Sequence, residues 1–260
     1  MSELKDTLFY TQKNMGETIS DDERLLSDSY CEGYRWFLDR SKTEREAVKT
    51  AISLVESVGF VPFEQGMPLK PGDRIFKSIR GKALMLAVIG KKSLAEGINI
   101  AGAHVDAPRL DLKQLPLYED NEIAYLKTHY YGGIRKYQWV TTPMELHGVV
   151  VKNDGEIVNV SIGGDETEPV LVITDLLPHL SAEQNKKTLG EAFPGEGMNL
   201  LVGSLPLKDD EGGDKVKLAV MKLLNEKYGI IEEDFLSAQL EAVPAFDSRD
   251  VGLDRSLIGS

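Results

Sequence analysis

The sequence predicts an α/β protein with a second, β-rich portion. Three observations lead to this prediction: an amphipathic helix at 41–59, two short apolar runs after it, and a series of β-rich runs beyond residue 110. Apolar residues that recur every three to four positions indicate a helix, whereas apolar runs of four to eight residues indicate buried strands. At 260 residues the chain is long enough for one large domain or two ordinary ones.

Segment 41–59 is predicted to be the amphipathic helix. Thr43 and Glu46 have the spacing of a capping box, in which each side chain accepts a hydrogen bond from the other residue's backbone amide. Gly59 is the kind of residue that commonly ends a helix. Six apolar side chains recur at helical spacing on one face: Ala47, Val48, Ala51, Ile52, Val55 and Val58.

Two apolar runs follow this helix and are predicted to be buried strands. They are ALMLAVI at 83–89 and GINIAGA at 97–103. Each run is too short for a helix, and a polar turn separates them. A helix followed by such strands indicates an α/β core.

A histidine and an aspartate, His104 and Asp106, stand where the second of these strands is predicted to end. In an open α/β sheet, ligands bind beyond the carboxyl ends of the strands. One imidazole nitrogen can bind a metal ion while a nearby carboxylate accepts a hydrogen bond from the other nitrogen and fixes the tautomer. Taken alone, the pattern also fits a histidine that only hydrogen-bonds to the backbone, so other motifs have to decide.

The segment after Leu110 is predicted to be β-rich. Its short runs are ELHGVVV at 145–151, EIVNVSI at 156–162 and PVLVIT at 169–174. Strong turn residues separate the runs, for example Asn-Asp-Gly at 153–155. A helix is predicted from Asp214 to Tyr228, with Gly229 ending it. This middle portion is expected to form a separate domain.

Composition and charge exclude several classes of function. Asp and Glu outnumber Lys and Arg by 42 to 30, which gives a net charge of −12, and no basic cluster could follow a phosphate backbone. Nucleic acid is therefore not an expected partner. No segment approaches the roughly 20 apolar residues that span a bilayer, and the N-terminus lacks the apolar stretch of a signal peptide, so no membrane partner is expected. With Cys31 as the single cysteine, the sequence predicts a cytoplasmic protein.

Six blocks together resemble the M18 family of metallo-aminopeptidases, the aspartyl aminopeptidases and their bacterial relatives. The resemblance spans nearly the whole chain. It implies a zinc-peptidase-like α/β domain, incomplete in this chain, that is interrupted by an inserted β-rich dimerisation domain. The implied boundaries are 1–110 for the first part of the α/β domain, 111–235 for the insertion and 236–260 for the return. The blocks are YRWFLDRSKTEREAV at 34–48, PGDRIF at 71–76, AHVDAPRLDLK at 103–113, YYGGIRKYQW at 130–139, LLPHLSAEQN at 176–185 and PAFDSRDVGLDRSLIGS at 244–260.

The resemblance also implies roles for three residues. His104 matches the first zinc-ligating histidine of the family, and Asp106 matches the carboxylate that orients it. His179 matches a histidine of the inserted domain that reaches across the dimer interface into the partner's active site, where it would hydrogen-bond the substrate carbonyl or the oxyanion. On sequence alone, without the resemblance, His179 would be interpreted as a surface residue or as a residue at the start of a helix.

The other histidines are expected to be structural, because neither has a carboxylate partner at ligand spacing. The residues of the YYGG stretch are expected to serve in packing and turns. Glu232 and Glu233 are expected to start a helix rather than to act as a catalytic pair. The two histidines are His129 and His147, and the YYGG stretch comprises Tyr130, Tyr131, Gly132 and Gly133.

The function implied by the resemblance is zinc-dependent removal of N-terminal residues, with acidic ones favoured, from peptides by a homo-oligomer. Two zinc ions are expected in the complete enzyme, and the family's remaining metal ligands would follow just beyond Ser260. A zinc site needs three or four protein ligands. The alternative is a catalytically inactive oligomerisation or binding module derived from the same fold. A serine hydrolase has little support, because no Gly-x-Ser-x-Gly motif occurs.

Overall fold

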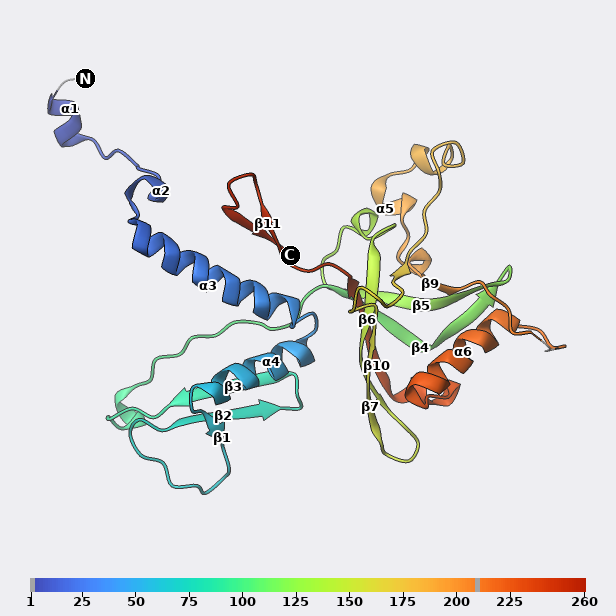
Figure 1. Cartoon of the computed structure of the whole chain (residues 1–260), viewed down its shortest axis with the longest axis horizontal. Coiled ribbons are helices and arrows are strands. Elements are labelled where there is room, and N and C mark those ends of the chain that lie inside the picture. The colour runs from blue at the N-terminus through green and yellow to red at the C-terminus, as the bar shows by residue number, and fades with distance from the viewer. Residues whose placement is uncertain (1–2, 209–210) are drawn as a thin grey trace. The chain divides into compact units, whose positions relative to one another are not determined.

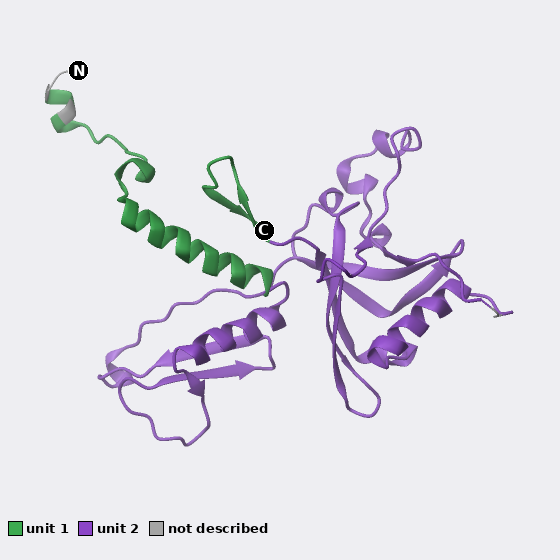
Figure 2. Cartoon of the chain, viewed as in Figure 1, with its two compact units in different colours: residues 1–40, 248–260 green, residues 41–247 purple. Residues whose placement is uncertain are grey.

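The computed structural model describes residues 3–208 and 211–260 and combines helices with β-sheets (Figure 1). It divides into two compact units (Figure 2). The first comprises residues 1–40 and 248–260, and the second comprises residues 41–247. None of the helices in the described ranges combines the length and apolar character required to cross a membrane.

The first unit consists of three helices and a small hairpin. Its longest helix starts at a capping box formed by Ser20 and Glu23. Near the other end of that helix, Arg35 Nη1 lies 3.0 Å from Asp250 Oδ1 of the hairpin, and Asp39 Oδ1 accepts a hydrogen bond from the Ser248 amide at 2.6 Å. The elements are α1 (Glu3–Leu8), α2 (Met15–Thr18), α3 (Asp21–Asp39), β11 (Arg249–Val251) and β12 (Leu257–Gly259).

The second unit begins with a helix and a three-stranded sheet. Helix α4 (Glu44–Ser57) starts at the predicted capping box: the Thr43 amide donates to Glu46 Oε2 at 3.1 Å, and the Glu46 amide donates to Thr43 Oγ1 at 3.4 Å. Gly59 follows it with φ of +87°, which confirms the predicted end. The sheet has the order β1 (Val61–Pro62), β2 (Arg74–Ile79) and β3 (Ala83–Val88), so the strand predicted at 83–89 is confirmed.

The strand predicted at 97–103 is wrong. A short 3₁₀ helix, η1 (Leu94–Glu96), is followed by irregular chain as far as Pro108. Ile98 and Ile100 are 61% and 80% exposed. An apolar run becomes a strand only where a neighbour pairs with its backbone. No strand among residues 3–208 and 211–260 pairs with this run.

The rest of the second unit is a β-sheet that closes on itself. The strand order is β10-β4-β5-β9-β8-β6-β7, and β10 also pairs with β6, so the sheet resembles a barrel. Its neighbouring strands are antiparallel. The strands are β4 (Arg109–Asp120), β5 (Ile123–Tyr131), β6 (Pro143–Val151), β7 (Ile157–Ile162), β8 (Leu171–Val172), β9 (Leu200–Gly203) and β10 (Ala238–Pro244).

The predicted β-rich runs are confirmed as β6, β7 and β8. The turn at 153–155 closes the β6–β7 hairpin, with the Gly155 amide donating to the Lys152 carbonyl at 2.8 Å. Gly148 lies in β6 between β7 and β10 with φ of +144°. A Cβ atom there would lie 1.9 Å from the Gln239 carbonyl oxygen, so the close approach of β10 requires glycine.

The barrel core is apolar and is covered by helix α6 (Lys215–Tyr228), which lies beside β4 and β5 (Figure 1). Gly229 ends this helix with φ of +67°, as predicted. Glu232 and Glu233 begin the 3₁₀ helix η5 (Glu232–Ser237), which confirms that they start a helical segment. Fully buried side chains of the core include Leu110, Met144, Leu200 and Val216. The remaining short helices are η2 (Lys136–Gln138), η3 (Gln184–Lys186), α5 (Leu189–Ala192) and η4 (Gly195–Gly197).

Candidate functional site

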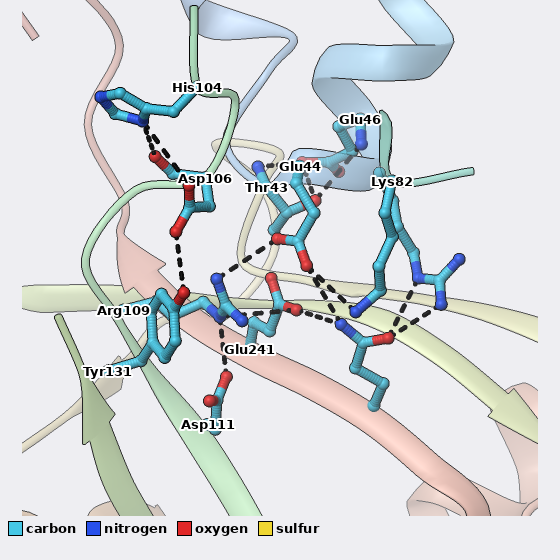
Figure 3. A network of polar contacts seen from close by, with 12 residues as sticks. Thr43, Glu44, Glu46, Lys82, His104, Asp106, Arg109, Asp111, Tyr131 and Glu241 are labelled. Atoms are coloured by element: carbon cyan, nitrogen blue, oxygen red, sulfur yellow. Dashed lines mark hydrogen bonds and ion pairs between the residues drawn. The ribbon is translucent and has the colours of Figure 1, made fainter. Parts of the chain in front are cut away.

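His104 and Asp106 lie in the irregular segment that leads into β4, and their side chains are close together (Figure 3). His104 Nδ1 lies 2.9 Å from the Asp106 carbonyl oxygen and 3.5 Å from Asp106 Oδ1. A carbonyl oxygen only accepts hydrogen bonds, so this contact places the proton on Nδ1. The His104 side chain is 86% exposed. Its Nε2 lone pair is thus the one that a metal ion could use.

Asp106 is held in turn by Tyr131, the last residue of β5. The Tyr131 hydroxyl donates to Asp106 Oδ2 at 2.9 Å. This hydrogen bond lowers the pKa of the Asp106 carboxyl group and raises the pKa of the tyrosine. Tyr131 therefore has a polar contact in addition to the packing role that the sequence predicted. The sequence held no signal for the contact, because the two residues are 25 positions apart.

Arg109, at the start of β4, supports the Tyr131 ring. The guanidinium carbon lies 4.1 Å from the ring centroid, within the range of a cation–π contact. The Arg109 side chain is only 11% exposed and contacts three carboxylates. The distances are 2.8 Å from Nε to Asp111 Oδ1, 3.4 Å from Nη1 to Glu44 Oε2 and 3.5 Å from Nε to Glu241 Oε1. A continuous series of contacts thus runs from α4 to His104 (Figure 3).

Two of the carboxylates that contact Arg109, Glu44 and Glu241, are buried. Burial, together with the nearby Glu44, raises the pKa of Glu241 to about 7. Burial acts to raise the pKa of Glu44, but hydrogen bonds from its own amide and from Lys82, together with the positive charges of Arg109 and Lys82, lower it overall. Gln239 Nε2 donates to Glu241 Oε1 at 2.6 Å and to Glu44 Oε1 at 3.3 Å. These contacts tie α4 to the barrel strand β10.

His147 on β6 has two carboxylate partners, which corrects the expectation that it has none. Its Nδ1 lies 2.8 Å from Glu46 Oε1, and its Nε2 lies 3.3 Å from Glu145 Oε2. Burial opposes the charged form of the imidazole, but the two carboxylates raise the pKa of His147 to about 9. Both ring nitrogens are therefore engaged, so His147 is a structural cation rather than a metal ligand.

His179 is an exposed residue in the turn at 178–180. Leu177 and Leu180 beside it are 58% and 63% exposed. No contact joins His179 to His104 or Asp106 in the part of the chain that the structure describes. Of the three predicted site residues, the fold therefore brings together only His104 and Asp106.

The donor set fits part of a zinc site. His104 offers a free imidazole nitrogen, and Asp106 and Tyr131 orient the ring from its other side, as outer partners of zinc-bound histidines commonly do. Among residues 3–208 and 211–260, no group of three or more His, Cys, Asp or Glu side chains is arranged to hold a metal ion. One ligand and its support are present, and further ligands are needed.

Known proteins resemble this chain in sequence and structure. A probable M18 family aminopeptidase 1 of Clostridium acetobutylicum is 51% identical over 243 residues, which are 91% of this chain and 52% of that protein. The crystal structure of an M18 family aminopeptidase from Thermotoga maritima matches with a TM-score of 0.89 at 43% identity, covering 96% of this chain and 54% of that one. The S. cerevisiae mApe1 dodecamer matches with a TM-score of 0.63 at 16% identity, covering 87% of this chain and 50% of that one, which is a likeness of fold alone.

The extent of these matches decides what they show. The chain spans about half the length of the relatives it matches. A family model described as Aminopeptidase I zinc metalloprotease (M18) matches residues 37–260, which is most of the chain. The chain therefore belongs to the M18 family of zinc metallo-aminopeptidases.

Proposed function

We propose that the protein is a zinc-dependent aminopeptidase that removes single N-terminal residues from peptides. The observation that carries the proposal is the orientation of His104, whose Nδ1 is occupied by Asp106 and whose Nε2 is free. Membership of the M18 family supports it. A cytoplasmic location is part of the proposal and rests on the single cysteine, Cys31.

In this proposal His104 Nε2 binds one of two zinc ions. Zinc, when bound, polarises a scissile carbonyl and lowers the pKa of a bound water toward about 7. Asp106 keeps the His104 proton on Nδ1, so that Nε2 stays available as the ligand. The relatives are about twice as long as the matched region. The other ligands and the general base would come from a segment that corresponds to their unmatched half.

Segment 111–235, together with the barrel strands β4 and β10 that extend beyond it to Arg109 and Pro244, is proposed to be an inserted dimerisation domain. The exposed leucines around His179 support an interface there, because contiguous apolar surface favours association. They are Leu176, Leu177 and Leu180. Across that interface, His179 would donate a hydrogen bond to the substrate carbonyl in the partner's active site.

The first test is metal dependence. We expect the natural full-length protein to release the N-terminal residue of a short peptide, to lose this activity in a zinc chelator and to regain it on addition of Zn²⁺. Peptides that begin with Asp, Glu, Leu or Lys would show whether acidic residues are favoured. Hydrolysis that survives complete removal of zinc would contradict the proposal. No hydrolysis by zinc-loaded protein would favour the inactive oligomerisation module.

His179→Ala tests the role across the interface. We expect kcat to fall roughly a hundred- to thousandfold, the usual cost of losing one oxyanion donor, with zinc content unchanged. Mixed dimers of His179→Ala and His104→Ala subunits should regain activity, because one of their two sites then has both histidines. His129→Ala, on the exposed side of β5, is the control. Loss of zinc in His179→Ala, or no recovery on mixing, would refute this role.

A further inference from the structure

We propose that Tyr131 is a positioning residue for His104, acting through Asp106 and itself held by Arg109. The inference rests on the proposed zinc site at His104. It adds an outer layer to that site, in which β4 and β5 of the barrel fix the direction of the zinc-binding imidazole.

The register of β4 and β5 places Tyr131 beside Arg109. The two residues are directly paired across the antiparallel strands, at the end of β5 and the start of β4. Just beyond them, Gly132 has φ of +79°, and a Cβ atom on it would lie 3.5 Å from Pro108 Cα. The strand pairing, with the Pro108–Gly132 contact just beyond it, therefore sets the position of the Tyr131 backbone from which the ring extends.

Arg109 fixes where the ring points. The guanidinium group is nearly buried, and its contacts to Asp111 and Glu44 come from two different elements. Those ion pairs leave it little freedom to move, because displacing it would take a positive charge away from the buried Glu44 and Glu241. The Tyr131 ring lies against this fixed group at 4.1 Å.

The hydroxyl of Tyr131 is the part that reaches the candidate site. It donates a hydrogen bond to Asp106 Oδ2, so that the other carboxylate oxygen, Oδ1, is the one that lies near His104 Nδ1. Without the hydroxyl, the carboxylate would be free to rotate about its Cβ–Cγ bond, and its partly exposed position offers water as an alternative partner. The imidazole would then be less well oriented for zinc.

Tyr131→Phe removes the hydroxyl and keeps the ring on Arg109. We expect the zinc affinity of the full-length protein to fall about tenfold, the lower end of the range for outer partners of a zinc ligand. Competition with a chromophoric chelator measures this. The melting temperature should stay at the wild-type value, and the ¹⁵N signals of the His104 imidazole should shift as the Asp106 Oδ1 contact loosens, while the backbone carbonyl keeps the proton on Nδ1. Tyr130→Phe, whose ring stacks on His129, is the matched control and should leave all three measurements at their wild-type values.

A double-mutant cycle separates positioning from a general structural effect. In an Asp106→Asn background, Tyr131→Phe should cause little further loss of zinc affinity, because the hydroxyl acts through that carboxylate. Equal losses in both backgrounds, or wild-type affinity in Tyr131→Phe, would overturn the inference. A His104→Ala variant that binds zinc as tightly as the wild type would instead overturn the proposed function, so the two failures are distinguishable.

Discussion

His104→Ala is expected to remove zinc and most of the activity from the full-length protein. His104 is the residue whose Nε2 faces outward while its other nitrogen is held by Asp106. Loss of an outer partner of a zinc ligand commonly lowers affinity or activity about ten- to hundredfold, and loss of the ligand itself should exceed roughly a hundredfold. Zinc per chain and kcat/KM for peptide hydrolysis measure the effect.

The high exposure of His104 makes this substitution a clean one. Its side chain is 86% exposed, so its removal leaves no cavity and should not change the melting temperature of the zinc-free protein. His129→Ala, an exposed histidine on β5, controls for non-specific loss of imidazole-bound zinc. A His104→Ala protein with a normal zinc content and normal turnover would show that the metal site lies elsewhere.

Local patterns predicted the elements whose signals lie within a few residues of one another. The capping box of Thr43 and Glu46, the turn at 153–155 and the glycine that ends α6 are all present where the spacing indicated. Each depends on backbone hydrogen bonds between near neighbours, which a single sequence contains. The proximity of His104 and Asp106 was predictable for the same reason, since two positions separate them, but the hydrogen bond goes to the Asp106 backbone carbonyl and the carboxylate oxygen lies 3.5 Å away.

Features that depend on distant partners were not predictable. The run at 97–103 has the composition of a strand but no pairing neighbour in the described chain. Tyr131 joins the site only through the β4–β5 register. His147 meets Glu46 only because α4 packs against the barrel, about a hundred residues away in the sequence. In each case the tertiary arrangement, rather than local propensity, decides the outcome.

His147 is expected to make the stability of the protein depend on pH. Its pKa rises from an ordinary value of 6.5 to about 9 in the folded state, so folding favours the protonated imidazole. The resulting stabilisation is fully present below pH 6.5 and is lost as the pH rises through 9. It amounts to about 3 kcal/mol of the free energy of unfolding. Lys42 Nζ, 3.5 Å from Glu145 Oε1, is the other cation facing this cluster.

His147→Gln keeps a polar side chain but cannot carry the charge. We expect it to be less stable than the wild type by about 3 kcal/mol at pH 6, and the difference to narrow toward zero by about pH 10, because the wild-type histidine has then lost its proton as well. Urea unfolding followed by tryptophan fluorescence, to which Trp139 on the barrel core contributes, measures this difference.

The titration of Glu241 changes the pH dependence of the free energy of unfolding, but it does so equally in the wild type and in His147→Gln. Its pKa of about 7 means that folding favours its protonated form, so its contribution is lost between pH 4.5 and 7 in both proteins. The difference between wild type and His147→Gln therefore isolates the histidine, provided that the two residues do not share a partner. The two residues are directly paired across β6 and β10, but their side chains contact different groups, since His147 contacts Glu46 and Glu145 whereas Glu241 contacts Arg109 and Gln239. A constant difference from pH 6 to 10 would mean that the buried imidazole is neutral throughout, and that the two carboxylates draw their charge compensation from Lys42 instead.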